Sequence, residues 1–370
     1  MNRDARLAMQ EPTAANGADS VGFEGSGSSG PLFAGSQEWL SDVASRSSVW
    51  AVRCLALVAA YVAIGYAVAG HLGLPLHWPL DHLFGQAYVV FLVAYGPLLL
   101  AYVVERIRGP QARLAHLRER LLSGRTFFEF IVAMLAVHVT LTVFVNLKQY
   151  VPAIQPALYD SPLWKLDAWL HFGFDPAVVA TEAAAAWGVL GLLDRAYLIF
   201  FPVQVVVPLL FLFAARLRPM RGPFFFSFCL LWMLGSAVYV FWPSLGPVYY
   251  WPSRFVWLDE APYAQHLQWL LIRDYALFRD SPAYYAVKLY YGVAALPSLH
   301  VGMFTLFAIA TWRWRPISAV LWALTLVTFA GSLALGWHYA VDGYAGALLA
   351  YASWWIGCRV AGSADARVRS

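Results

Sequence analysis

Two short stretches in the C-terminal part of the chain bring imidazole, hydroxyl and carboxylate groups close together. ALPSLHVGM contains Ser298 and His300, and GWHYAVDGYAG contains His338 and Asp342. Residues four apart share one face of a helix, so Asp342 is expected to hydrogen-bond to His338. A neutral imidazole held by a carboxylate can attack phosphorus, and a second imidazole can protonate the departing alkoxide. The pattern therefore predicts phosphoryl-group chemistry.

Both stretches are predicted to begin helices, at the same face of a membrane. The first N–H groups of a helix have no partner within it, and the helix dipole favours anions there. Two such ends beside two imidazoles predict a phosphate pocket. The scheme requires no metal, and the sequence shows no acidic cluster to hold one, so we expect neither a metal nor a cofactor.

Other interpretations of the same residues stay open. A single histidine at a helix end is often an interfacial hydrogen-bonding residue, and a His-x-x-x-Asp pair can simply stabilise a helix. A haem held by His300 and His338 is a further possibility, with Asp342 orienting one ligand. The occurrence of all these residues on one predicted membrane face favours phosphoryl chemistry.

The composition is that of a polytopic membrane protein. Of the 370 residues, 61% are hydrophobic and only 12% are charged, whereas charged residues make up near a quarter of a soluble domain. The net charge of +4 gives no indication of nucleic-acid binding. The three cysteines lie in apolar segments without disulfide or metal spacing, which predicts that they pack as apolar side chains.

Eight apolar segments are candidates to cross the hydrocarbon, which takes about 20 residues each. The predicted fold is all-α, a polytopic membrane helix bundle of about eight spans. The candidate spans are 49–71, 86–105, 127–147, 196–215, 223–242, 298–312, 317–336 and 340–357.

Arginine placement predicts the orientation. Arginines cluster in the loops after the second, fourth, sixth and eighth candidate spans, on the side of the N-terminus, and the positive-inside rule makes that side the cytoplasm. The site residues then lie on the outer face, which in a bacterium is the periplasmic side of the inner membrane. The arginines concerned are Arg106, Arg108, Arg113, Arg118, Arg120, Arg125, Arg216, Arg218, Arg221, Arg313, Arg315, Arg359, Arg367 and Arg369.

Composition also suggests a division of the chain. Residues 1–45 are rich in Gly, Ser and Ala and are expected to be a disordered cytoplasmic tail. Residues 46–126 form a two-span extension with an Arg-rich loop, 127–357 form the catalytic membrane domain, and 358–370 form a second cytoplasmic tail. The oligomeric state is not predicted.

Two outer segments are expected to cover the site. Residues 148–190 contain LWKLDAWLHF, which predicts a helix on the membrane surface. The polar residues that punctuate this segment are expected first to cap and tether, namely Asp160, Asp167, His171 and Asp175. In FWPSLGPVYYWPSRFVW, the aromatic residues around Tyr249 and Trp251 predict a wall over the pocket or a belt at the interface.

Both catalytic stretches resemble the second and third signature blocks of the type 2 phosphatidic acid phosphatase (PAP2) superfamily. An upstream region, NLKQYVPAIQPALYDSPLWKLDAWLHFGFDP, is similar to a segment that precedes the catalytic core in bacterial relatives of the Aur1-type inositolphosphotransferases. The resemblance covers roughly residues 127–357 and is closest to this transferase branch, whose members make inositol phosphorylceramide.

The resemblance implies a role for each site residue. His338 would be the nucleophile that forms a phosphohistidine, and Asp342 would orient it. His300 would protonate the leaving group and later act as base. Ser298 and neighbouring backbone N–H groups would contact phosphate oxygens.

The chain departs from the phosphatase branch in its basic residues. That branch has an arginine six residues before the nucleophilic histidine, where this chain has Ser332. Its first block, a lysine followed by Arg-Pro, is not evident before Pro297. The candidates to meet the phosphate charge are therefore Lys148, Arg254 and Lys288, of which Lys148 lies in the matching upstream block and could equally be a snorkelling lysine.

The sequence thus predicts a membrane enzyme that moves a phosphoryl-headgroup from a phospholipid to a lipid alcohol. A PAP2-type phosphatase of lipid phosphates or polyprenyl pyrophosphates is the alternative within the same superfamily. A transporter or haem-binding membrane protein is the alternative of another class. Catalytic groups at headgroup depth favour lipid substrates over soluble phosphates.

Overall fold

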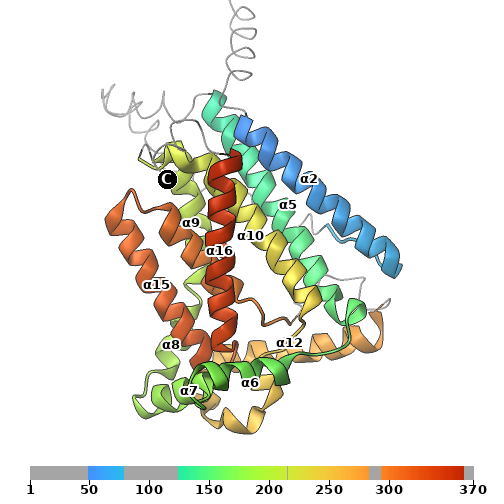
Figure 1. Cartoon of the computed structure of the whole chain (residues 1–370), viewed down its shortest axis with the longest axis vertical. Helices are drawn as coiled ribbons and strands as arrows, with labels where there is room; N and C mark the ends of the chain where they lie inside the picture. The colour runs from blue at the N-terminus through green and yellow to red at the C-terminus, as the bar shows by residue number, and fades with distance from the viewer. Residues whose placement is uncertain (1–48, 79–123, 215, 283–292, 362–370) are drawn as a thin grey trace, which may run out of the picture. The chain divides into compact units, whose positions relative to one another are not determined.

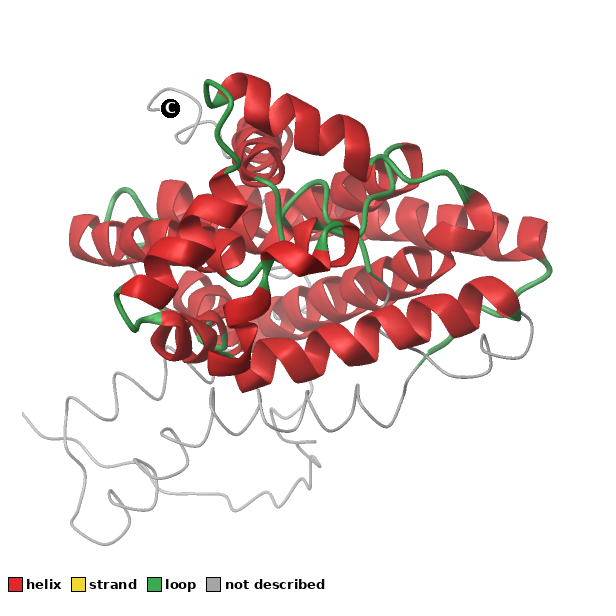
Figure 2. Ribbon diagram, turned by 90° about the horizontal axis from the view of Figure 1, so that it is seen from below, coloured by secondary structure: helices red, strands yellow, loops and turns green. Residues whose placement is uncertain are grey.

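The apolar segments fold as α-helices in a computed structural model that describes residues 49–78, 124–214, 216–282 and 293–361 (Figure 1). No strand occurs among these residues (Figure 2). Helices suit a membrane because they satisfy every backbone N–H and C=O internally. The predicted all-α class is confirmed. The candidate span at 86–105, most of the Arg-rich loop, the predicted tail 1–45 and Lys288 lie outside the described residues.

The described residues form α-helices and 3₁₀ helices. They are α2 (Val49–Leu72), α5 (Gly124–Ile154), α6 (Asp160–Leu170), α7 (Pro176–Ala186), α8 (Leu190–Tyr197), α9 (Phe200–Phe213), η1 (Arg218–Met220), α10 (Arg221–Phe241), α11 (Pro247–Tyr250), η2 (Pro252–Arg254), η3 (Val256–Glu260), α12 (Pro262–Asp280), α14 (Leu299–Ala310), α15 (Arg315–Ala334) and α16 (Ala340–Ala361).

Five helical stretches in the described part of the chain are long and apolar enough to cross a membrane. The fourth predicted span begins earlier than expected, because the helical stretch already starts at Leu190. The helix at the sixth predicted span, α14, has 12 residues, which is about 18 Å at 1.5 Å per residue and less than the hydrocarbon thickness. A total of eight spans stays a prediction. The five stretches are Val49–Leu72, Thr126–Ile154, Leu190–Phe213, Arg218–Phe241 and Arg315–Ala334.

Small residues allow the central helix α10 to pack closely against its neighbours α2, α5 and α16. A Cβ atom added at Gly357 would lie 2.0 Å from Ser227 Oγ, and one at Gly222 would lie 2.7 Å from Trp50 Cβ. Within membranes, where lipid and side chains are equally apolar, such close backbone approach is a main source of helix association. The helices around α10 share one large hydrophobic core.

A second small-residue contact brings the N-terminal ends of α14 and α16 together. A Cβ atom at Gly346 would lie 2.2 Å from the carbonyl oxygen of Ser298, and one at Gly302 would lie 2.9 Å from the carbonyl oxygen of Gly346. Any larger side chain at either glycine would force the two backbones apart. This contact places the stretch with Ser298 and His300 next to the stretch with His338 and Asp342.

Helix α6 lies across the N-terminal end of α16, and α12 also runs crosswise to the long helices (Figure 1). On α6, Asp160, Leu163 and Asp167 are buried, whereas Trp169 is 75% exposed. The helix predicted in the 148–190 segment is therefore present and two-sided. Its two buried aspartates point to the protein, and the aromatic side chain of Trp169 faces outward.

Candidate active site

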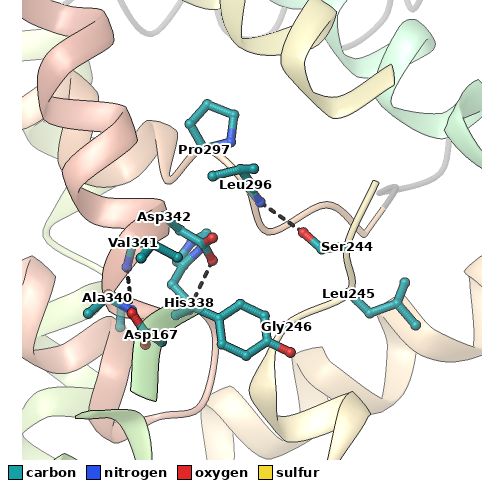
Figure 3. A network of polar contacts seen from close by, with 12 residues as sticks. Asp167, Ser244, Leu245, Gly246, Leu296, Pro297, His338, Ala340, Val341 and Asp342 are labelled. Carbon is teal, nitrogen blue, oxygen red and sulfur yellow. Dashed lines mark hydrogen bonds and ion pairs between the residues drawn. The ribbon is translucent and has the colours of Figure 1, made fainter. Parts of the chain in front are cut away.

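His338 and Asp342 form a hydrogen-bonded pair at the start of α16. His338 Nδ1 lies 3.3 Å from Asp342 Oδ2, and both side chains are buried (Figure 3). The helix begins only at Ala340. The prediction that both residues lie on a helical face is therefore wrong for His338, which sits in the preceding loop, although the expected hydrogen bond is formed.

The loop before α16 is fixed by backbone hydrogen bonds to the end of α15. The N–H groups of Trp337 and His338 donate to the carbonyl oxygen of Ser332, at 2.9 and 3.3 Å. Gly336 turns the chain there with a φ of +70°, a conformation that costs glycine little. An Nδ1–H group that donates to Asp342 leaves Nε2 of His338 with its lone pair, which is the form of imidazole that a nucleophile requires.

His300 is the second residue of α14, and its ring centroid lies 6.4 Å from that of His338. The imidazole packs against two aromatic rings, with centroid distances of 4.2 Å to Phe200 and 5.0 Å to Tyr197. Within the described part of the chain, neither ring nitrogen of His300 forms a hydrogen bond. The structure thus brings His300, His338 and Asp342 together, as predicted.

Ser298 precedes α14 and ties it to α16. Its N–H donates to the carbonyl oxygen of Asp342 at 2.9 Å. The residue is fully buried, and its Oγ has no hydrogen-bond partner among the described residues. No side chain caps the N-terminal end of α14. This helix end therefore keeps donors of the kind that an anion needs.

The N-terminal end of α16 is different, because a carboxylate from α6 already occupies it. Asp167 accepts the N–H groups of Ala340 and Val341, at 2.8 and 3.0 Å (Figure 3). Asp342 Oδ2 accepts the N–H of Tyr339 at 2.9 Å. The prediction that this helix end binds phosphate is wrong, since two carboxylates use its N–H groups.

Asp160 forms a second contact between α6 and this region. Its carboxylate accepts hydrogen bonds from the N–H groups of Leu245 and Gly246 and from the hydroxyl of Tyr339, each at 2.9 Å. Burial raises the pKa of Asp160, whereas these donors act to lower it. The same balance holds for Asp167, whose pKa is raised by burial and lowered by its two backbone donors.

The tethering interpretation of this segment is confirmed for three of its four polar residues. Asp160 and Asp167 bind backbone as described, and His171 Nε2 lies 2.9 Å from the hydroxyl of Tyr344 in α16. It is wrong for Asp175, which precedes α7 but makes no side-chain capping bond. Burial raises the pKa of Asp175, and the charge of Arg254 acts in the opposite direction.

Of the three basic residues expected to meet phosphate, the structure brings Lys148 near the site. Its Nζ lies 5.6 Å from the ring centroid of Tyr239, whose hydroxyl donates to the carbonyl oxygen of Pro297 at 3.1 Å. Lys148 is therefore separated by one side chain, that of Tyr239, from the loop that carries Ser298.

Arg254 is not brought to the site. It is exposed, and its guanidinium lies over the ring of Trp251 at 5.0 Å. Among the described residues it makes no contact with His300, His338 or Asp342. Its place just outside the fifth predicted span gave no information on the direction in which the side chain points. Lys288 lies outside the described residues.

Two further features of the site escaped sequence reasoning. Ser244 holds the loop before α14, because its Oγ accepts the N–H of Leu296 at 3.1 Å and its carbonyl oxygen accepts the N–H of Ala295 at 2.9 Å (Figure 3). The repeated Trp-Pro-Ser around it was the available signal. Tyr197 and Phe200, which pack on His300, come from an apolar span that carries no local motif.

These features define an all-helical integral membrane protein with two imidazoles and a carboxylate gathered at the ends of two adjoining helices. Comparison with known families agrees. The family described as the PAP2 superfamily matches residues 161–356, more than half of the chain, and the chain belongs to this superfamily. No curated protein and no solved structure matches it.

Membership establishes the type of chemistry. Members of the superfamily are phosphatases or phosphotransferases, so the chain is an enzyme with a lipid-directed function of this type. The matched region begins in α6 and ends in α16. It therefore includes Asp167 as well as His300, His338 and Asp342, whereas Lys148 precedes it.

Proposed function

We propose that the enzyme transfers a phosphoryl-headgroup from a phospholipid to a lipid alcohol through a phosphohistidine at His338. The observation that supports this proposal most is the pairing of buried His338 with buried Asp342 while a second imidazole lies close by. The ring centroids of His300 and His338 lie 6.4 Å apart, so both imidazoles lie within reach of one phosphoryl group.

The first half of the reaction forms the phosphohistidine. Nε2 of His338 attacks phosphorus, an N–P bond forms, and the P–O bond to the lipid alkoxide breaks. His300, in its protonated form, gives its proton to that alkoxide, which leaves as diacylglycerol. Asp342 stabilises the positive charge that develops on the His338 imidazole and keeps the Nδ1 proton in place.

The second half reverses these roles with a different alcohol. His300, now neutral, accepts the proton of the acceptor hydroxyl as its oxygen attacks phosphorus. The N–P bond breaks, its electron pair returns to Nε2, and His338 is again a neutral nucleophile. The headgroup phosphate ends on the acceptor lipid, and no net proton is consumed.

Phosphate oxygens are best placed at the start of α14. The hydroxyl of Ser298 lacks a partner, and α14 has no side-chain cap, so these donors support anion binding there. Lys148 adds positive charge from α5 and is separated from the same loop by the side chain of Tyr239. We assign Ser298 and Lys148 to phosphate binding and leave Arg254 out of the site.

The basic residues also bear on the transferase assignment. At Ser332, where the phosphatase branch has arginine, the hydroxyl donates to the carbonyl oxygen of Phe329 at 2.8 Å and the residue is fully buried. It serves the turn before His338 and contributes no charge. A site with less positive charge suits a phosphodiester headgroup, which carries fewer charges than a phosphomonoester, and we assign the chain to the inositolphosphotransferase-like branch on this basis.

We place the active site on the outer face of a bacterial inner membrane, with both termini in the cytoplasm. The arginine distribution supports this orientation. Residues 127–357 form the catalytic domain in this proposal, between a two-span extension at 46–126 and the tails at 1–45 and 358–370.

A transfer assay tests the proposal. The purified protein in vesicles receives phosphatidylinositol labelled in its phosphate, with or without a lipid alcohol such as ceramide. We expect labelled product only with the acceptor, and an alkali-stable labelled protein without it. Release of free phosphate or phosphoinositol without acceptor would instead assign the chain to the hydrolytic branch, and equal turnover by His338→Gln would reject the phosphohistidine.

A further inference from the structure

We propose that Asp167 is a positioning residue that keeps Asp342 available to His338. The inference rests on the proposed function, because it gives the His338–Asp342 pair a catalytic role. Among the described residues, Asp167 makes no contact with the imidazole of His300 or His338. It acts on the backbone at the start of α16.

The side chains of α6 that meet α16 share one helical face. Asp160, Leu163 and Asp167 of α6 and His171 directly after it are separated by steps of three or four residues, which places them in one row. Leu163 packs with Tyr339 and Val341. Three polar members of the row bind the first turns of α16 or the residue before it. Helix α6 and His171 therefore hold the start of α16, which carries the proposed catalytic pair, through several hydrogen bonds.

The hydrogen bonds at the start of α16 show what Asp167 contributes. Three successive backbone N–H groups, those of residues 339 to 341, point out of the helix end, and two carboxylates accept them. Asp342 takes one, through the same oxygen that meets His338. Asp167 takes the other two. Buried N–H groups need partners, and Asp342 Oδ1 has none among the described residues, so without Asp167 the two freed donors would draw Asp342 toward the helix end.

The distances indicate which bond would yield. Asp342 Oδ2 lies 2.9 Å from the N–H nitrogen of Tyr339 but 3.3 Å from His338 Nδ1. The bond to the imidazole is the longer and hence the weaker of the two. A displacement of Asp342 toward the helix end would therefore lengthen its bond to His338 first.

Asp167 also determines where phosphate does not bind. Its carboxylate occupies the N–H groups of α16 and adds negative charge there. An anion is therefore disfavoured at this helix end and favoured at the uncapped start of α14. The nucleophile and the phosphate are thereby assigned to different helix ends.

The chain contains a matched control for this role. Asp194 in α8 accepts the N–H groups of Tyr263 and Ala264 at the start of α12, at 3.0 and 2.9 Å. It is 3% exposed and Asp167 is 2% exposed. The two aspartates thus cap a distant helix in the same way, but α12 carries none of the proposed catalytic residues.

The test compares Asp167→Asn with Asp194→Asn in the full-length protein. Asparagine keeps the shape but offers one acceptor oxygen, so each variant loses one of its two capping bonds. We measure kcat and KM in the transfer assay, thermal stability, and amide hydrogen exchange of peptides from each helix start. Exchange is expected to rise at 339–341 in the first variant and at 263–264 in the second, with similar losses of thermal stability.

Catalysis is expected to separate the two variants. For Asp167→Asn we expect kcat to fall on the order of 10- to 100-fold with KM within about twofold, as for outer partners that orient reacting groups. For Asp194→Asn both constants should stay within about twofold. Asp167→Glu retains the charge and is expected to recover part of the lost kcat.

Each outcome decides something. If Asp167→Asn exposes residues 339–341 to exchange but keeps kcat equal to that of Asp194→Asn, Asp167 is only structural and the inference is overturned. If Asp167→Asn does not fold, the same comparison is made with Asp167→Glu, where lost protection with unchanged kcat is the contrary result. Failure of the proposed function shows separately, as turnover retained by His338→Gln, and leaves the exchange result unaffected.

Discussion

The N-terminal ends of α14 and α16 lie side by side, yet they are built in opposite ways. The start of α16 is closed by Asp167 and Asp342, which accept three successive N–H groups. The start of α14 has no side-chain cap, and the hydroxyl of Ser298 beside it has no partner among the described residues. One end carries buried negative charge, and the other retains hydrogen-bond donors.

This difference divides the proposed chemistry between the two helices. A nucleophilic imidazole gains from neighbouring carboxylates, because they stabilise the positive charge that develops on it. A phosphate group gains from free N–H donors and is repelled by carboxylates. If both ends were open, phosphate could bind in two registers, only one of which would face Nε2 of His338. Closing one end selects a single register.

The largest expected effect comes from the two histidines. Replacement by Gln at His338 should lower turnover about 10⁴-fold or more, since the proposed covalent intermediate forms on its imidazole. His300→Gln should be as severe with a lipid alkoxide, which needs a proton to leave. We measure both by transfer of label between lipids and by labelled protein after an alkaline quench.

An aryl phosphodiester sharpens the contrast between the two histidines. A phenolate leaves without a proton, so His300→Gln should still accumulate the phosphohistidine from this substrate, whereas His338→Gln should not. Accumulation in His338→Gln and not in His300→Gln would exchange the two roles and assign the nucleophile to α14.

Asp342→Asn is expected to have the next largest effect. The amide preserves the shape but presents the wrong hydrogen-bond partner to Nδ1, and comparable changes in His–Asp pairs lower kcat about 10⁴-fold. The variant should retain KM within a few-fold, because Ser298 and the start of α14 are untouched. A rise in KM with an unchanged kcat would mean that Asp342 contributes to substrate binding rather than to the nucleophile.

How much of this was predictable depends on how far apart the interacting residues lie in sequence. The helical class follows from long apolar segments. The His338–Asp342 bond was expected from a helical spacing of four, but it joins the loop before α16 to the first turn of that helix. The cap on α16 joins residues 173 positions apart. No local sequence pattern predicts that a carboxylate from another helix caps this helix end. The open helix end predicted for α16 was wrong for that reason.

The sequence also could not predict the direction in which the basic side chains point. Lys148 and Arg254 were both expected on the outer face as phosphate ligands. Lys148 lies over the ring of Tyr239, which contacts the loop before α14. Arg254 ends a short 3₁₀ helix, is exposed and lies over the ring of Trp251. Helical segments carry a readable phase, and irregular segments do not.

A glycine substitution tests whether the two helix ends must lie this close. In Gly346→Ala the new Cβ would lie 2.2 Å from the carbonyl oxygen of Ser298, so α14 has to move away. We expect a loss of about 1–3 kcal/mol in the free energy of unfolding and a kcat lowered by about tenfold or more, measured by thermal unfolding in detergent and by the transfer assay.

Gly331→Ala is the matched control for this change. A Cβ atom at Gly331 has no neighbour closer than 3.8 Å, and alanine favours a helix by roughly 0.5–1 kcal/mol over glycine. This variant should be as stable as the parent or slightly more so. Full activity in a stable Gly346→Ala protein would show that the two helix ends need not touch for catalysis.

The smallest effect is expected from the basic residues, compared as Lys148→Met and Arg254→Met. Methionine keeps an apolar stem in place of either cation. A charge-assisted hydrogen bond is worth about 1.5–3 kcal/mol, so Lys148→Met should raise KM or lower kcat/KM by roughly tenfold or more, whereas Arg254→Met should change either by less than about twofold. The defect of Lys148→Met should shrink for a substrate with fewer phosphate charges, because less charge then needs to be met. An equal or larger defect in Arg254→Met would bring the exposed arginine back into the site and would mean that the segment from 247 to 254 closes over bound substrate.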